Sequence, residues 1–196
     1  MNHKWIRETE RLVIREMTPA DLNALCHIMC DEEGMCPAYE RAFSPDEVQG
    51  WLNRHLNRYR NDGYGLWAVV LKETGEMIGQ CGLTRQTWKE KEVLEIGYLF
   101  QKEHWHRGYA TEAAIACKEY AFSVLDAEWV YSIIRDTHVA SQKVALRNGM
   151  RLLDRDTKNF RNVDMNFYLY GVERDRERHK QALSDDGSSP FPQKAK

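Results

Sequence analysis

The feature that most constrains the fold is a change of apolar period near residue 108. Upstream, Leu94, Ile96, Tyr98 and Phe100 alternate with their neighbours, which is the period of a β-strand. Downstream, the apolar residues recur at helical spacing, at Ala110, Ala113, Ala114, Cys117, Ala121, Val124 and Leu125. A strand-like run follows over residues 129–134. Strand, helix and strand in succession predict two parallel strands joined by a crossover helix.

Gly108 stands at the turn from this strand to this helix. A glycine there lets the backbone approach a bulky ligand closely, and the free N–H groups of the first helical turn point outward as donors. The helix dipole favours an anion at the same end, so the turn predicts a diphosphate site. By itself the glycine is weak evidence, because a glycine before a helix is more often simple turn punctuation.

Capping patterns predict two early helices. Thr18-Pro19-Ala20-Asp21 and Ser44-Pro45-Asp46-Glu47 each combine a hydroxyl N-cap with proline at the first helical position. The segment between them, residues 31–43, is expected to be a loop. A short later helix is predicted over residues 139–148, ending at Gly149.

The remaining apolar runs predict strands. We expect a buried strand over residues 66–71, a turn at Thr74-Gly75, a second strand ending near Leu83, and a last strand over residues 165–170. Consecutive strands joined by turns pair antiparallel. The predicted fold class is therefore α+β, with a mixed, mostly antiparallel central sheet flanked by helices. The exposed edge expected at residues 165–170 would allow a dimer.

The turn Trp105-x-x-Gly108-x-Ala110 resembles the pyrophosphate loop of the GNAT superfamily of acyl-CoA-dependent N-acyltransferases, which reads Gln/Arg-x-x-Gly-x-Gly/Ala. Its two small positions match and its first does not. A tryptophan there resembles the Rim-type branch, which acetylates the N-termini of ribosomal proteins. Other segments resemble that branch in order and spacing: residues 9–15 its opening strand, 78–83 its third strand, 95–98 its fourth and 140–150 its late helix. The resemblance spans about residues 8–172, so we expect a GNAT domain over residues 1–175 and a charged, flexible tail over 176–196.

The resemblance implies acetyl-CoA as cosubstrate, with no metal. Backbone N–H groups of the turn would cradle its pyrophosphate, which involves Trp105, His106, Arg107, Gly108, Tyr109, Ala110 and Thr111. Arg107 could add a charge-assisted contact to a phosphate, or could simply be a solvated arginine. The family's splayed fourth strand further implies that backbone groups of Leu99 and Phe100 pair with pantetheine, and Gly97 fits a strand that must bulge or admit another backbone closely.

Glu95 is the candidate general base. Strand alternation places it with Gly97 and Leu99 on one face, where apolar neighbours should raise its pKa toward neutrality. The alternative is a structural hydrogen bond or ion pair.

Ser141 is the candidate acid for the leaving thiolate. It matches the serine of the family's Asn-x-x-Ser pattern, although a helix-start hydroxyl satisfying the backbone is the alternative. His138 occupies the asparagine position, a departure that puts the usual contact with the cofactor in doubt. Histidine can still donate a hydrogen bond, and it titrates near pH 6.5. Tyrosines 98, 109, 168 and 170 are assigned to packing.

The acceptor is expected to be a primary amine. In relatives the helix–loop–helix region lines the acceptor site, so Met35, Tyr39 and Phe43 are candidate substrate contacts, or else they tuck the loop onto the core. The Rim-type resemblance suggests a protein N-terminal α-amine. A small-molecule amine or amino acid is the alternative, as is a catalytically silent acyl-CoA-binding protein. The absence of Gly-x-x-x-x-Gly-Lys-Ser/Thr and Gly-x-Gly-x-x-Gly motifs disfavours a nucleotide-binding protein.

The composition of the chain gives no reason to expect a nucleic-acid or membrane partner. The net charge of −2 over 196 residues gives no global argument for nucleic acid or for an anionic membrane, and no apolar run approaches a bilayer span. Arg54, Arg58 and Arg60 predict a solvated helix face, not a nucleic-acid contact. We therefore expect a cytoplasmic monomer or homodimer.

Metal binding is also disfavoured by the sequence. The cluster of Cys26, His27, Cys30 and Cys36 lacks the Cys-x-x-Cys spacing of zinc sites and is better explained by core cysteines. His104 and His106 lack a third ligand.

Overall fold

The computed structural model describes residues 4–39, 41–160 and 163–175. Within these ranges the chain forms one eight-stranded sheet in the order β1-β2-β3-β4-β5-β6-β8-β7. The strands are β1 (Trp5–Glu8), β2 (Leu12–Arg15), β3 (Leu66–Leu71), β4 (Met77–Trp88), β5 (Lys91–Phe100), β6 (Trp129–Arg135), β7 (Arg151–Phe160) and β8 (Val163–Glu173). The β5–β6 pair is parallel and the other neighbours are antiparallel. The predicted mixed, mostly antiparallel sheet is confirmed.

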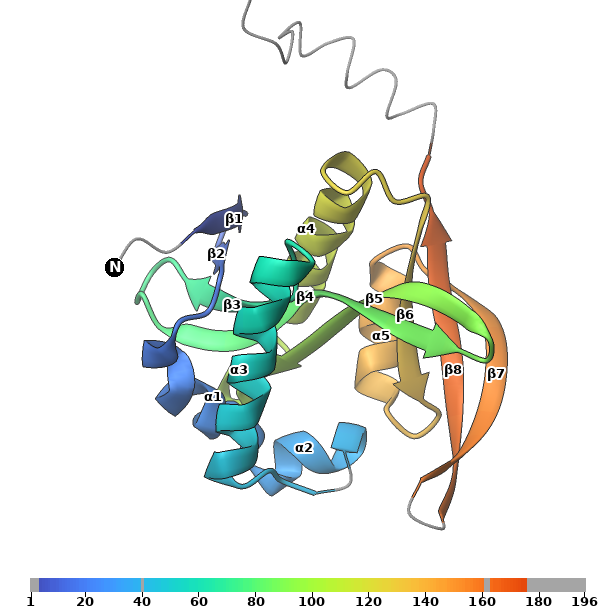
Figure 1. Ribbon diagram of the computed structural model, residues 1–196, viewed down its shortest axis with the longest axis horizontal. Coiled ribbons are helices and arrows are strands. Elements are labelled where there is room, and N and C mark those ends of the chain that lie inside the picture. Colours follow the sequence, from blue (N-terminus) through green and yellow to red (C-terminus); the bar gives the residue numbers. More distant parts are fainter. Residues whose placement is uncertain (1–3, 40, 161–162, 176–196) are drawn as a thin grey trace, which may run out of the picture.

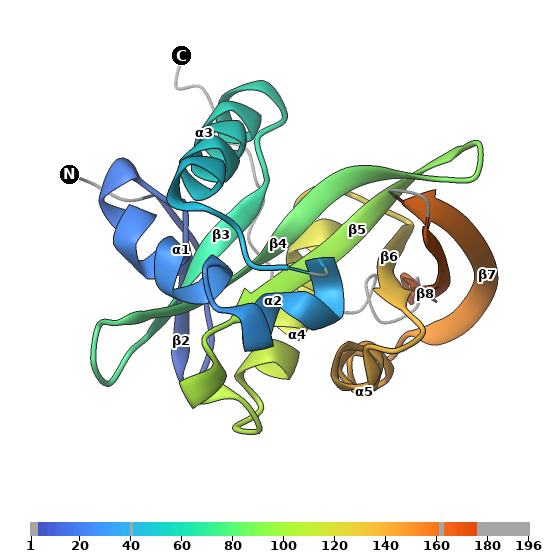
Figure 2. The ribbon, with the colours of Figure 1, turned by 90° about the horizontal axis from the view of Figure 1, so that it is seen from below.

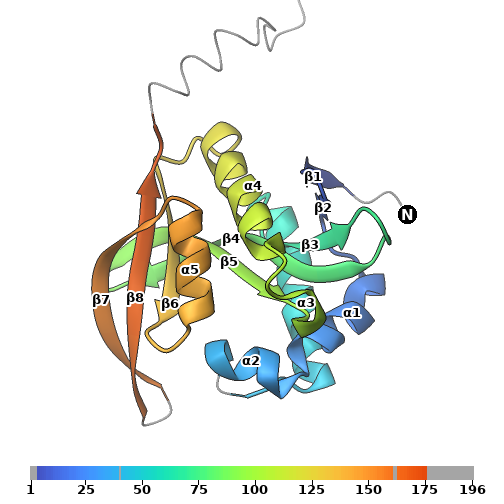
Figure 3. The ribbon, with the colours of Figure 1, turned by 180° about the vertical axis from the view of Figure 1, so that it is seen from behind.

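Helices cover both faces of the sheet (Figure 1). On one face lie α1 (Leu22–Met29), α2 (Glu32–Tyr39) and α3 (Pro45–Asn61); on the other, seen in front in Figure 3, lie α4 (Tyr109–Ser123) and α5 (Val139–Arg147). Two short 3-10 turns, η1 (Pro19–Asp21) and η2 (Lys102–His104), precede α1 and α4. Each helix layer buries its own core cluster against the sheet.

The small residues of α4 bring this helix close to the sheet. Ala113, Ala114, Cys117 and Ala121 are almost fully buried, as their helical spacing predicts. Because short side chains shorten the distance between layers, the start of α4 is fixed near the end of β5. This position matters for the site described below.

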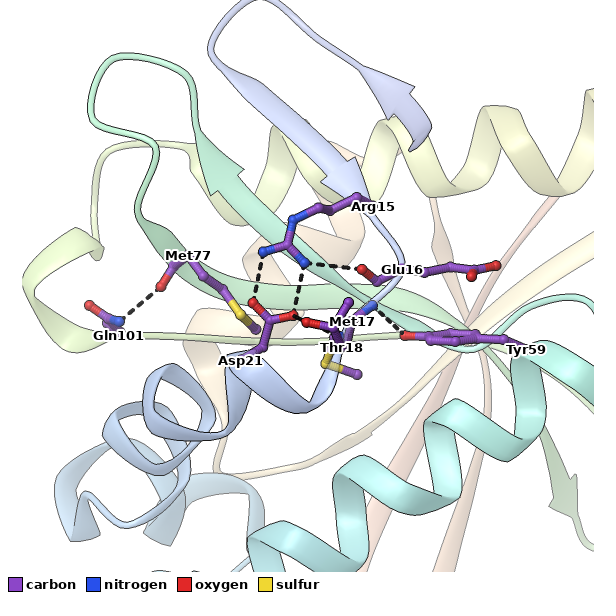
Figure 4. A network of polar contacts seen from close by, with 8 residues as sticks. All are labelled: Arg15, Glu16, Met17, Thr18, Asp21, Tyr59, Met77 and Gln101. Atoms are coloured by element: carbon purple, nitrogen blue, oxygen red, sulfur yellow. Dashed lines mark hydrogen bonds and ion pairs between the residues drawn. The ribbon is translucent and has the colours of Figure 1, made fainter. Parts of the chain in front are cut away.

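A buried ion pair fixes the start of α1 (Figure 4). The Arg15 guanidinium donates to both Asp21 carboxylate oxygens at 2.9 and 2.7 Å, and the Thr18 N–H donates to Asp21 at 2.7 Å. Burial alone would raise the pKa of Asp21, but these hydrogen bonds and the charge of Arg15 outweigh it and leave the pKa below its usual range. The Tyr59 hydroxyl accepts from the Met17 N–H at 3.3 Å, which ties α3 to the same corner.

The segment between the early helices is not the loop that the sequence predicts. It contains α2, whose Met35 N–H donates to the Asp31 carbonyl at 3.0 Å. Gly34 and Pro37 are both helix breakers, so propensity argues against a helix here. Tertiary contact overrides propensity because Met35 is fully buried in the core beneath α1 and α3.

The strands differ from the prediction in three ways: the end of β4, the pairing of β8 and the number of strands at the start of the chain. β4 runs to Trp88, well past Leu83, because Lys89 adopts a left-handed φ of 53° and closes a tight hairpin without the usual Gly or Asn. β8 is not a sheet edge, since it pairs with β6 and β7 on its two sides. The opening strand is a hairpin in which β1 precedes β2.

Two further expectations concern the C-terminal tail and a membrane-spanning segment. The predicted tail over residues 176–196 lies outside the described residues. Within the described ranges, no helix has both the length and the apolar character that crossing a bilayer requires.

Candidate active site

The two parallel strands at the centre of the sheet diverge (Figure 2). Glu95 faces Tyr131 as their one registered pair in the described chain, whereas β4 and β5 remain paired from Trp88 and Lys91 to Gly79 and Phe100. Beyond that pair, the Ser132 hydroxyl donates to the Ile96 carbonyl at 2.8 Å. The divergence opens a cavity of about 360 Å³, lined from the α3 side by Trp51 and from the α5 side by Ser141.

Strand alternation decides which backbone groups of β5 face this cavity. The Gln101 N–H donates to the Ile78 carbonyl at 3.0 Å, so odd-numbered residues turn toward β4. The Ile96 carbonyl faces β6, so even-numbered residues turn toward the gap. By this alternation the backbone groups of Tyr98 and Phe100, and not those of Leu99, turn toward the gap. Tyr98 and Leu99 line the cavity, whereas Phe100 does not.

Glu95 lies at the point where the strands part. Its carboxylate accepts from the Ile133 N–H at 3.3 Å and from the Thr84 hydroxyl at 3.4 Å, and it lines the cavity. Burial raises the pKa of Glu95, only partly offset by these hydrogen bonds and by the charge of Lys158. The predicted rise in pKa is confirmed. A carboxylate with a raised pKa is a stronger base than an ordinary glutamate, which suits proton abstraction.

His138 and Ser141 meet on the opposite side of the gap, at the start of α5. The Ser141 hydroxyl lies 3.4 Å from His138 Nε2, and both residues line the cavity. Burial and the charge of Arg135 lower the pKa of His138, so the imidazole is neutral at neutral pH. Tyr98 joins them, because its hydroxyl donates to the Ser141 carbonyl at 3.0 Å.

The turn between β5 and α4 has an inner and an outer part. The Trp105 indole N–H donates to the Phe100 carbonyl at 2.9 Å, so this side chain fixes the end of β5. Trp105 is partly buried and Tyr109 is buried. His106, Arg107 and Gly108 are exposed, and the first-turn N–H groups of Ala110 and Thr111 follow them in α4.

An ion pair braces this turn from outside. Arg11 binds the Glu112 carboxylate through Nε at 2.7 Å and Nη2 at 2.6 Å, and its Nη1 donates to the Arg107 carbonyl at 2.9 Å. The Thr9 hydroxyl donates to Glu112 at 2.6 Å. The hairpin between β1 and β2 therefore holds the N-terminus of α4 in place, which pre-organises its donors.

Gly108 gives a direct test of the cradle. Its φ is 83°, and an added Cβ would meet only the Arg11 guanidinium at 3.4 Å. Because a left-handed conformation costs a non-glycine residue about 1 kcal/mol, we expect Gly108→Ala to shift the turn and weaken acetyl-CoA binding by about tenfold, measured by calorimetry. Gly149→Ala is the matched control, since Gly149 has the same φ of 83° but lies beyond α5. Equal affinities for the two variants would exclude the turn as the cradle.

The three residues predicted to contact the acceptor lie in different environments in the structure. Tyr39 lines the cavity. Phe43 stands behind it, with ring centroids 5.3 Å from Tyr39 and 6.0 Å from Trp51. Met35 is fully buried in the core and does not line the cavity. Tyr39 is 38% exposed, and its partial burial together with the charge of Glu95 raises the pKa of its hydroxyl. Tyr39 and Glu95 both line the cavity.

The sequence interpretation missed a cationic part of the cavity wall. Arg54 and Arg58 of α3, expected on a purely solvated face, line the cavity with Trp51 and His55, and Lys158 of β7 lines it from across. The signal was present, because residues 51, 54, 55 and 58 follow one helical stripe. Lys158 had no such signal, since only the curvature of β7 brings it here.

The cysteines pack into the cores. Cys26 and Cys30 are partly buried against the α1–α3 core, and Cys81 and Cys117 are buried together under α4, with sulfur atoms 3.5 Å apart. Cys36 has no described side chain. The arrangement agrees with the predicted packing role for the four described cysteines.

Comparison with known proteins assigns the family. The acetyltransferase (GNAT) domain family matches residues 11–151. The chain belongs to the GNAT acetyltransferase family. This acetyltransferase is 33% identical over 150 residues to the uncharacterized protein YkkB of Bacillus subtilis (strain 168), a match that covers 76% of this chain and 87% of YkkB. It is 26% identical over 147 residues to the uncharacterized N-acetyltransferase YoaA of the same organism, covering 74% and 82% of the two chains.

Solved structures agree with this assignment. The acetyltransferase from Agrobacterium tumefaciens str. C58 is 27% identical with a TM-score of 0.71, over 89% of this chain and 95% of that one. The ribosomal L7/L12 α-N-protein acetyltransferase RimL, in complex with coenzyme A, is 15% identical with a TM-score of 0.73, over 87% and 98%. The latter likeness is one of fold. The predicted GNAT resemblance is thus confirmed, and a Rim-type protein is among the structural neighbours.

Acetyl-CoA, which GNAT acetyltransferases use, is consistent with the chemistry of the residues present. The left-handed glycine opens α4 with unpaired first-turn donors, and the even-numbered backbone groups of β5 face a gap that β6 does not fill. A pyrophosphate suits the first of these features and the amides of a pantetheine arm suit the second.

Proposed function

We propose that this enzyme transfers an acetyl group from acetyl-CoA to a primary amine by direct attack. The observation that carries the proposal is the cavity at the β5–β6 gap, which is lined by Glu95 where the strands part and by residues of both α3 and α5. A carboxylate there can reach an amine from one side, while hydroxyl groups stand on the other. Such an arrangement supports a reaction in which two partners meet inside the sheet.

The protein groups have distinct roles in this proposal. The N–H groups at the start of α4 hold the pyrophosphate, and the backbone of Tyr98 and Phe100 holds the pantetheine arm, with one N–H toward the thioester oxygen. Acetyl-CoA supplies an activated acetyl thioester when bound. Glu95 accepts the proton of the amine, directly or through water, and the Ser141 hydroxyl protonates the departing thiolate.

Neutral His138 supports Ser141 in this role. With Nε2 3.4 Å from the hydroxyl, the imidazole can accept a hydrogen bond from it or donate one to it, and it need not carry the proton itself. A protein N-terminal α-amine and a small amine are both compatible with an open cavity of this size.

Release of free CoA tests the proposal. Purified protein is mixed with acetyl-CoA and a panel of primary amines, and CoA is measured by chromatography. We expect CoA release that requires both the amine and the protein, and a decrease of about tenfold in Ser141→Ala. Acetyl-CoA binding without amine-dependent CoA release would instead favour a silent binding protein. Full activity in Ser141→Ala would move the acid role to another group.

A further inference from the structure

The acceptor side of the cavity carries an excess of positive charge. Arg54 and Arg58 enter from α3 and Lys158 from β7, whereas Glu95 is the one carboxylate on the described wall. His55 adds no charge, because burial and the charges of Arg58 and Arg54 lower the pKa of His55 to about 3. Its Nδ1 accepts from the Leu66 N–H at 3.2 Å, as a neutral ring does.

None of these three cations forms an ion pair with a carboxylate among the described residues, although the charge of Lys158 acts on Glu95. The ion pairs of the described chain involve other cations, such as Arg41 with Glu47 and Arg85 with Glu92. Arg54 lies over the Trp51 ring at 5.5 Å, and Lys158 lies 5.1 Å from the Trp88 ring centroid and 5.8 Å from that of Phe167. Aromatic faces orient a cation but leave its N–H donors unused.

We infer that the acceptor of this enzyme carries a carboxylate beside its primary amine, which Arg54 and Arg58 bind. This inference rests on the proposed acetyl transfer and specifies its substrate class. Arginine N–H groups form paired hydrogen bonds with a carboxylate, and Arg54 and Arg58 stand one helical turn apart on the stripe that faces the cavity. A neutral or polycationic amine finds no complement to these charges.

The same charges favour the reaction itself. An amine attacks only in its neutral form, and nearby cations lower the pKa of an ammonium group. Glu95 can then take the proton while the arginines hold the carboxylate away from it. The carboxylate has two sources, the α-carboxylate of a free amino acid or an acidic side chain at a peptide N-terminus.

Matched acceptors test the inference with the full chain at saturating acetyl-CoA. One pair is alanine and alaninamide, and the other is Asp-Ala-Ala-amide and Asn-Ala-Ala-amide, with CoA release as the readout. We expect the acid to exceed its amide in kcat/KM by about tenfold in at least one pair. A preference in the first pair identifies the α-carboxylate of an amino acid as the group bound, and a preference in the second pair identifies an acidic side chain at a peptide N-terminus. The ratio should fall as salt is added.

Charge-removing variants then assign the effect. In Arg54→Gln or Arg58→Gln the acid-to-amide ratio should approach one, whereas Arg60→Gln, an exposed arginine on the same helix that does not line the cavity, should keep it. Amides equal to or better than acids in the wild type, or a ratio that persists in both variants, would overturn the inference. No CoA release with any acceptor despite acetyl-CoA binding would instead overturn the proposed transfer.

Discussion

Replacing Glu95 by glutamine should lower kcat/KM at pH 7 by about a hundredfold while leaving acetyl-CoA affinity unchanged. Glutamine keeps the size of the side chain and an oxygen that can accept from Ile133 and Thr84, but it cannot take a proton. Glu92→Gln is the matched control, because Glu92 is exposed on the same strand and does not line the cavity. Steady-state CoA release and calorimetry separate the two effects.

The pH profile identifies the role of Glu95 more strictly than the loss of rate. Because burial raises the pKa of Glu95, the acid limb of log kcat/KM should lie above the ordinary glutamate range of about 4.3. Below that pKa the carboxyl is protonated and cannot accept the proton of the amine. Glu95→Gln should lose this limb. A variant with the wild-type limb, or with wild-type turnover, would remove Glu95 from the mechanism.

Although Glu95→Gln should lower activity, it should raise the free energy of unfolding at high pH. A carboxyl whose pKa is raised in the folded state favours folding below its unfolded pKa and loses that contribution as pH rises through its folded pKa. At pH 8 the folded protein holds Glu95 charged in a site that disfavours charge. Glu95→Gln should therefore be more stable than the wild type at pH 8, by about 1 kcal/mol, with the gain vanishing below pH 4. Thermal unfolding at both pH values measures it.

The local patterns in this chain predict its fold well. The change of period at Gly108, the capping boxes and the parallel pair all describe contacts between residues near in sequence or in adjacent elements. α2 was missed because its stability comes from burial of Met35, not from local propensity. The sequence prediction ended β4 too early because Lys89-Glu90, where the β4–β5 hairpin turns, carries no turn signal.

The site was predicted where a linear motif or strand alternation defines it. Glu95, Ser141 and the turn after β5 lie where the sequence pattern puts them, and the gap between β5 and β6 brings Glu95 and Ser141 to one cavity. The preference for Tyr98 over Leu99 required knowledge of which side of β5 pairs with β4. Lys158 required the three-dimensional course of β7, which no residue pattern in the chain specifies.

Two glycines that face each other across β4 and β5 should respond in opposite ways to alanine. Gly82 pairs in register with Gly97. A Cβ on Gly82 would lie 2.1 Å from the Gly65 carbonyl oxygen and 2.7 Å from the Leu66 Cα, which are backbone atoms of the neighbouring segment. A Cβ on Gly97 would meet only the Leu66 side chain at 3.6 Å, an ordinary contact on the cavity wall. The first glycine is required for packing and the second leaves space in the site.

Gly82→Ala should therefore lower the free energy of unfolding by about 3 kcal/mol, since β3 must move away from β4 to admit the methyl group. The midpoint of thermal unfolding should fall by roughly 6–12 °C for a domain of this size. Gly97→Ala should unfold near the wild-type temperature, yet lower kcat/KM by about tenfold because its methyl group enters the cavity beside Glu95. Wild-type stability in Gly82→Ala would show that the two strands can separate freely. Wild-type turnover in Gly97→Ala would place the acceptor away from this part of β5.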